Sequence, residues 1–217
     1  MHKKQVVVIH EGEPVEAFYK YSIASFSWYR ERPGWDVLEK ADLIVDWTVE
    51  DDHSRIDFYR ETTRPVLLGE VVHTLEELGV THLPIGRMNH WPTFVERPIT
   101  ELSLPRSHRT KMTDLMDEVL LAFHDAPDVP GFLSSRIAMT VINEAYRTLG
   151  ERVASAQTID LAMRQAANYP IGPFDWFEKI GPKRVLALLE KLAQTRERYT
   201  PAKELIKRVN NAAAAKR

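Results

Sequence analysis

The chain has 217 residues, and its 29 basic and 31 acidic side chains give a formal net charge of −2. A balance this close to neutral excludes a general electrostatic attraction to nucleic acid or to anionic lipid. The absence of cysteine excludes disulfides, thiolate metal sites and a cysteine nucleophile. Because no apolar run approaches the ~20 residues that span a bilayer and no signal peptide is visible, we expect a soluble, cytoplasmic protein.

Short apolar runs separated by polar segments dominate the first part of the chain. The β-branched run Gln5–Ile9 is typical of a strand that is buried on both faces of a parallel sheet. The segments between them carry helical spacing or turn residues, so the pattern predicts an α/β domain. The predicted strands are Gln5–Ile9, Ala24–Tyr29, Leu43–Val45 and Pro65–Leu68, and the predicted helices are Glu13–Tyr21, Asp36–Lys40, Asp51–Glu61, Thr74–Leu78 and Leu115–Phe123.

Helical order runs through the rest of the chain, from Asp128 onward. Gly150 is expected to end the first helix by adopting the left-handed conformation, and Ser155 is expected to cap the second. Pro173 and Pro182 each suit the first position of a helix, where proline loses no hydrogen bond. A last helix over Ala202–Asn211 completes a compact all-α unit. The apolar faces of the other helices are Ala138, Ile142, Ala145 and Leu149; Ile159, Ala162, Met163 and Ala166; and Val185, Leu188, Leu189 and Leu192.

A series of short motifs marks this helical part. They are Asp128, Pro130-Gly131-Phe132, Arg136, Asn143-Glu144-Ala145, Ala154-Ser155, Ile159-Asp160, Ala162-Met163 and Tyr169-Pro170-Ile171-Gly172-Pro173-Phe174. In this order they resemble the C-terminal domain of the 3-hydroxyacyl-CoA dehydrogenase family, which includes 3-hydroxybutyryl-CoA dehydrogenases. The resemblance implies a Rossmann-like α/β domain with a shortened parallel sheet over residues 1–127. It further implies an all-α domain of the 6-phosphogluconate-dehydrogenase-like type over residues 128–217.

The resemblance also implies a chemistry, which is the NAD-dependent oxidation of a 3-hydroxyacyl-CoA in fatty acid metabolism by a homodimer formed through the helical domain. Cofactor binding would then involve Gly12, Asp46 and Glu50. The glycine-rich turn of the family reads His10-Glu11-Gly12-Glu13-Pro14-Val15 here, so only the second of its three glycines remains. Glu11 and Glu13 bring negative charge to the place where a pyrophosphate would bind, which opposes binding. The helical hairpin that contacts coenzyme A in the family is absent.

The catalytic region of the family corresponds to Leu83–Leu102. A family histidine removes the hydroxyl proton there, and a glutamate orients that histidine. Aligned on Ile85-Gly86 and Pro92, the histidine position falls on Met88, whose thioether cannot accept a proton. A histidine two residues further on would share its face in an extended segment. The predicted catalytic residues are therefore His90, Glu101 and Ser135, the last replacing the family's asparagine, and the predicted substrate-binding residues are Asn89 and Thr74.

Two functions remain open from the sequence. In the first, the chain is a family relative in which NAD-dependent oxidation is altered or lost. It then binds an acyl-type ligand or a partner protein through the cleft that serves as the active site in the family. In the second, it is a working dehydrogenase on a 3-hydroxyacyl or other hydroxy-acid substrate, with a displaced His90 and Glu101 pair. Either way we expect an acyl-CoA or hydroxy-acid type small molecule as ligand, and neither nucleic acid nor a membrane as partner. No carboxylate–histidine spacing predicts a metal site.

Overall fold

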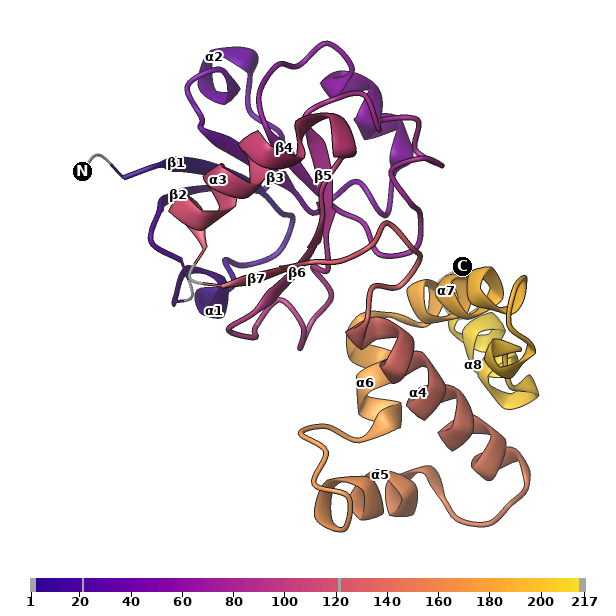
Figure 1. The fold of residues 1–217 in the computed structure, drawn as a ribbon. Helices are drawn as coiled ribbons and strands as arrows, with labels where there is room; N and C mark the ends of the chain where they lie inside the picture. The colour runs from indigo at the N-terminus through magenta and orange to yellow at the C-terminus, as the bar shows by residue number, and fades with distance from the viewer. Residues whose placement is uncertain (1–2, 21, 121, 215–217) are drawn as a thin grey trace. The chain divides into compact units, whose positions relative to one another are not determined.

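The computed structural model describes residues 3–20, 22–120 and 122–214, and the chain divides into two compact units (Figure 1). The first unit is Met1–Leu133 and the second is Ser134–Arg217. The segment 128–133 thus folds with the first unit, where Asp128 is hydrogen-bonded to Arg87. No helix within the described ranges is long and apolar enough to cross a membrane.

The first unit is built on a seven-stranded sheet with the order β2-β1-β3-β4-β5-β6-β7. All neighbouring strands pair in parallel except β5 and β6, which are antiparallel. The four strands predicted from apolar runs are confirmed as the first four of this sheet. The strand bounds are β1 Gln5–Ile9, β2 Ser25–Tyr29, β3 Leu43–Asp46, β4 Val66–Gly69, β5 Ile85–Met88, β6 Thr100–Ser103 and β7 Phe123–Asp125.

Alternate residues of the central strands supply two separate cores, one on each face of the sheet. Val6 and Val8 pack with α1 (Glu16–Lys20) and α3 (Arg109–Val119), whereas Val7 and Ile9 pack with α2 (Trp35–Leu38) and the 3-10 helix η1 (His53–Tyr59). Successive side chains of a strand point to opposite faces, so an uninterrupted apolar run is required when both faces are covered. This double burial explains the β-branched sequence of β1.

Several predicted helices of the first unit differ from the structure. The Asp51–Glu61 helix is a 3-10 helix that begins after Asp52, whose carboxylate accepts the Ser54 N–H. The predicted Thr74–Leu78 helix is a series of turns that ends at Gly79, whose φ is +69°. The prediction at Leu115–Phe123 was shifted, because α3 begins at Arg109 and Phe123 belongs to β7. Residue 21, at the end of the predicted first helix, lies outside the described residues.

The second unit is helical, as predicted. Its elements are α4 Ser134–Gly150, α5 Ala156–Gln165, α6 Pro173–Ile180, α7 Pro182–Ala193, a short 3-10 helix η3 Glu197–Tyr199 and α8 Lys203–Ala214. Ser155 caps α5 by accepting the Thr158 N–H, and the two prolines open α6 and α7. The expectation for Gly150 was wrong, since it remains helical and the left-handed residue after α4 is Arg152, with φ of 59°.

Two of the motif residues in this unit hold its helices together. The Asp160 carboxylate accepts the backbone N–H groups of Phe174 and Asp175 at 2.9 and 3.3 Å and so caps α6. Gly172 makes room for it, because a Cβ atom there would lie 2.3 Å from Asp160 Cγ. Asn143 joins α4 to the start of α8, since its amide donates to Thr200 O and accepts from Ala202 N at 2.9 and 2.8 Å.

Candidate functional site

The carboxyl ends of the central parallel strands provide the candidate site. Ile9 pairs with Asp46 and Asp46 pairs with Leu68, so β1, β3 and β4 end along one edge of the sheet. The chain places β2 on one side of β1 and β3 on the other, which makes the ends of β1 and β3 a topological switch point. Ligands of open α/β sheets bind in the crevice at such a point.

The loop after β1 is occupied by its own side chains, an imidazole and two carboxylates. The His10 ring packs edge-on against Trp47 and Trp28, with ring centroids 5.1 and 6.3 Å away. Gly12 lies against this imidazole, because a Cβ atom at Gly12 would come within 2.7 Å of His10 Nε2. Glu11 lies 3.5 Å from Arg55 and Glu13 is paired with Arg30. The helix that follows, α1, has only five residues and starts at Glu16. Its N-terminus is therefore a weak anion-binding site for a pyrophosphate.

Asp46 ends β3, and the structure buries it among protein donors. Its Oδ1 accepts the Thr48 N–H at 2.9 Å, and its Oδ2 accepts the Tyr59 hydroxyl at 2.8 Å. Burial and the neighbouring Asp46 carboxylate raise the pKa of Tyr59, so this phenol stays protonated and donates. The buried Asp46 carboxylate therefore stabilises the turn after β3 through hydrogen bonds to Thr48 and Tyr59.

Glu50 lies at the centre of the same edge. Its side chain is only 4% exposed and stands 3.6 Å (Oε2) from His90 Nε2. Oε1 accepts the Val71 N–H at 2.9 Å and Oε2 accepts the Trp91 indole N–H at 2.7 Å. Glu50 thus connects the segments that follow β3, β4 and β5.

The two candidates for the base position have different surroundings. Met88 is fully buried in the core, where its Sδ accepts the Trp47 indole N–H at 3.3 Å. His90 is 6% exposed and lies against the end of β4. Glycine at position 69 is required for this packing, since a Cβ atom there would come within 2.8 Å of His90 Cγ and 2.7 Å of Trp47 Cα.

Glu101, the predicted partner of His90, is brought to Asn89. The antiparallel register pairs Met88 with Leu102, and the Asn89 N–H donates to Glu101 O at 3.0 Å. Directly opposed residues of neighbouring strands point to the same face of a sheet, whereas successive residues of one strand alternate between faces. The Glu101 side chain therefore lies on the same face as that of Asn89. Its Oε2 accepts the Asn89 amide at 2.9 Å, and its Oε1 accepts the Leu133 N–H at 3.2 Å. The structure thereby groups His90 with Glu50 and Asn89 with Glu101.

Two further predicted residues are Thr74 and Ser135. Thr74 and Glu77 bond each other's backbone N–H groups, which occupies the Thr74 hydroxyl as an acceptor. Ser135 belongs to the second unit, in the first turn of α4.

A buried arginine in β5 was missed by sequence reasoning. Arg87 is fully buried; its Nε donates to Asp128 Oδ1 at 2.7 Å and a terminal nitrogen donates to Val129 O at 2.6 Å. Its guanidinium also lies over the Phe132 ring, 4.3 Å from the centroid. Burial lowers the pKa of Arg87, and Asp128 opposes that shift. Two features of the sequence could have indicated this ion pair. One is Arg87, a charged residue within the buried strand β5, and the other is Asp128, the acidic residue that opens the helical motif series.

Comparisons with known proteins fit this architecture. The model of the 3-hydroxyacyl-CoA dehydrogenase C-terminal domain matches residues 131–217. The probable 3-hydroxybutyryl-CoA dehydrogenase of Bacillus subtilis is 34% identical over 171 residues, which cover 71% of this chain and 58% of that protein. The 3-hydroxyadipyl-CoA dehydrogenase of Escherichia coli is 46% identical over 83 residues, or 37% of this chain and 18% of that protein. The crystal structure of the Ralstonia eutropha (S)-3-hydroxybutyryl-CoA dehydrogenase superposes with a TM-score of 0.68 at 20% identity, covering 86% of this chain and 70% of that one.

The helical unit belongs to the 3-hydroxyacyl-CoA dehydrogenase C-terminal domain family, and the chain as a whole is similar to members of that enzyme family. Its fold is a Rossmann-like α/β unit followed by a helical unit, as the sequence predicts. It spans less than two thirds of the length of the curated relatives described above, at 18% and 58%. The helical unit carries the family motifs quoted above, with Ser135 in place of the family's asparagine. The other departures lie at the ends of β1 and β5, where Glu11, Glu13 and Met88 stand.

Proposed function

We propose that this family member has altered or lost NAD-dependent oxidation of 3-hydroxyacyl-CoA and binds an acyl-type ligand through the cleft at the sheet edge. The observation that carries the proposal is the burial of Met88. At the position of the family's base, this thioether is fully buried and accepts a hydrogen bond from Trp47. A thioether is at most a weak acceptor and does not take up a proton near neutral pH, so general-base catalysis fails at this position.

The loop after β1 supports the same proposal. A pyrophosphate approaches a dinucleotide-binding loop through glycine backbone and a helix N-terminus. Here the loop carries the His10 imidazole, packed on two tryptophans, and two carboxylates that are paired with arginines. An approaching phosphate would have to displace these carboxylates or lie beside them. Binding of NAD at Gly12, Asp46 and Glu50 is therefore expected to be weak.

A second candidate function is supported by the placement of His90. Its imidazole is buried within 3.6 Å of the Glu50 carboxylate, the kind of partner that orients a catalytic histidine. In this version the chain remains a dehydrogenase on a 3-hydroxyacyl or other hydroxy-acid substrate. His90 is its base, Glu50 orients that base in place of the predicted Glu101, and Asn89 contacts the substrate.

One experiment separates the two functions. Purified chain is assayed for NADH formation with NAD and a panel of 3-hydroxyacyl-CoA substrates, and its thermal unfolding midpoint is measured with NAD and with acyl-CoA. We expect no turnover above the enzyme-free rate and a midpoint raised by acyl-CoA but not by NAD, because only a ligand that binds the folded form stabilises it. NADH formation that disappears in His90→Ala and persists in the exposed control His82→Ala would establish the second function instead.

The assembly and location of the protein are further proposals. We propose a homodimer formed through the helical unit, where an apolar groove of about 710 Å³ is lined by α4 and α5. We also propose a cytoplasmic location. The dimer is what the resemblance to the family implies, and neither proposal depends on whether NAD is oxidised.

A further inference from the structure

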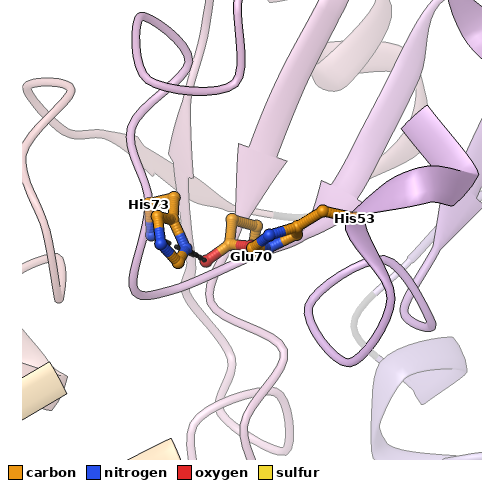
Figure 2. Close-up of side chains that lie close together, drawn as sticks. All are labelled: His53, Glu70 and His73. Carbon is orange, nitrogen blue, oxygen red and sulfur yellow. Dashed lines mark hydrogen bonds and ion pairs between the residues drawn. The ribbon is translucent and has the colours of Figure 1, made fainter. Parts of the chain in front are cut away.

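Three side chains from two segments, the start of η1 and the loop after β4, meet beside the sheet edge. His53 opens η1, Glu70 directly follows β4, and His73 lies three residues further on (Figure 2). Figure 2 shows the two imidazoles approaching the Glu70 carboxylate from opposite sides. His53 Nε2 lies 2.7 Å from Glu70 Oε2, and His73 Nδ1 lies 3.5 Å from Glu70 Oε1. One ligand atom from each residue falls within 4.8 Å of the other two.

The carboxylate of this cluster is held in place by the backbone. Glu70 is fully buried, and its Oε1 accepts the N–H groups of Val72 and His73 at 2.8 and 2.7 Å. Metal-binding carboxylates are oriented by outer hydrogen bonds of this kind, which leave one oxygen for the ion. A buried carboxylate requires partners that compensate for its lost hydration, and a bound cation is one such partner.

Hydrogen bonding without an ion leaves one nitrogen of the cluster unsatisfied. His73 Nδ1 is buried and has no hydrogen-bond partner within the part of the chain that the structure describes. The nearest carboxylate oxygen, at 3.5 Å, is beyond good hydrogen-bond range and already accepts two backbone N–H groups. A buried polar nitrogen with no partner is destabilising, so its retention points to a ligand.

The geometry is close to what an ion needs. Bonds of about 2.0–2.2 Å in a tetrahedral site separate the ligand atoms by roughly 3.4 Å. The 2.7 Å contact between His53 and Glu70 must therefore open by less than about one ångström. The His53 side chain, 39% exposed, has the freedom to move this far.

We propose that His53, Glu70 and His73 form a binding site for a divalent transition-metal ion. Two imidazoles and one carboxylate suit zinc, cobalt, nickel or ferrous iron, whereas magnesium and calcium require a shell of oxygen ligands. The two histidines are 39% and 37% exposed, so the ion enters from solvent, and the remaining coordination positions take water or an oxygen of a small ligand. Sequence spacing does not reveal the site, because 17 residues separate His53 from Glu70.

The test is a metal titration of the full chain after chelator treatment. Zinc binding is measured by calorimetry and cobalt coordination by its visible absorption, with magnesium as the probe that is expected not to bind. We expect one zinc ion per chain, a cobalt spectrum typical of four or five ligands, and an affinity at least about tenfold weaker in His53→Gln and in His73→Gln. His124→Gln, an exposed histidine of β7, is the matched control and should bind as the parent does.

Two outcomes overturn the proposal. One is a parent chain that binds neither zinc nor cobalt, which would leave a hydrogen-bonded cluster only. The other is undiminished zinc affinity in both histidine variants, which would place the ion elsewhere. Both histidines are more than a third exposed, so their variants are expected to fold even if Glu70→Gln does not, and circular dichroism verifies this. Neither outcome bears on NAD oxidation.

Discussion

Arg87 is a buried arginine of β5 that pairs with Asp128 within the first unit. It is fully buried, while its partner Asp128 is 27% exposed. Removing one partner of a buried ion pair leaves the other charge uncompensated, so Arg87→Met should lower the free energy of unfolding by about 3 kcal/mol, near the low end of the usual range because Asp128 keeps some solvent. Chemical denaturation measures the change.

Arg164 provides the control for this residue. It forms a similar pair with Asp175 at 2.7 Å, but both side chains are largely exposed, at 40% and 61%. Exposed pairs contribute little, so Arg164→Met should change the free energy of unfolding by less than about 1 kcal/mol. Equal losses in the two variants would show that Arg87 acts as an ordinary surface arginine.

The sequence could predict the positions of some candidate site residues, but not which residues they pair with. Asp46 and Glu50 were candidates because family motifs mark their positions, and His90 was a candidate because it lies two residues beyond Met88; all three lie at or beside the sheet edge. Their partners were not predictable, because pairing depends on register. A shift of one residue between β5 and β6 exchanges Asn89 for His90 opposite Glu101. The cluster of His53, Glu70 and His73 was hidden for a related reason, since only the fold brings these segments together.

At the level of elements, predictability follows local sequence pattern. Three of the first four strands, β1, β3 and β4, are apolar runs buried on both faces, and all four were predicted within a residue or two. The later strands β5, β6 and β7 carry the polar residues Arg87, Glu101 and His124, so no apolar run identifies them. They become strands because neighbouring strands satisfy their backbone groups, an effect of tertiary structure that local propensity does not contain.

The N-terminus of α6 offers a test of how one element is fixed by another. Asp160 on α5 accepts two backbone N–H groups of α6 and is 6% exposed. Losing such a cap destabilises by about 1–2 kcal/mol, so Asp160→Ala should lower the free energy of unfolding by that amount and reduce amide exchange protection in α6. Asp175→Ala removes an exposed carboxylate from the same helix and should cost less than about 1 kcal/mol. Undiminished protection of α6 in the first variant would contradict the capping role.

At the scale of the whole molecule, the surface of the helical unit raises the question of assembly. Its groove is lined mainly by apolar side chains of α4, α5 and the turn between them, and Val153 in that turn is 69% exposed. An exposed apolar groove of this kind is typical of a surface that another chain covers. Because such a surface is the same patch on both copies, a two-fold dimer would bury it on each.

We therefore expect the parent chain to scatter light as two copies of 25.0 kDa and to unfold at a temperature that rises with protein concentration. Val153→Glu puts a charge into the groove at an exposed position, so it should weaken dimerisation by about tenfold or more without unfolding the chain, since burying an unpaired charge is costly. Ile99→Glu, a similar change at a residue that is 56% exposed in the first unit, should leave the dimer intact. A parent chain that stays monomeric at all concentrations, or a Val153→Glu dimer as strong as the parent's, would refute assembly through this groove.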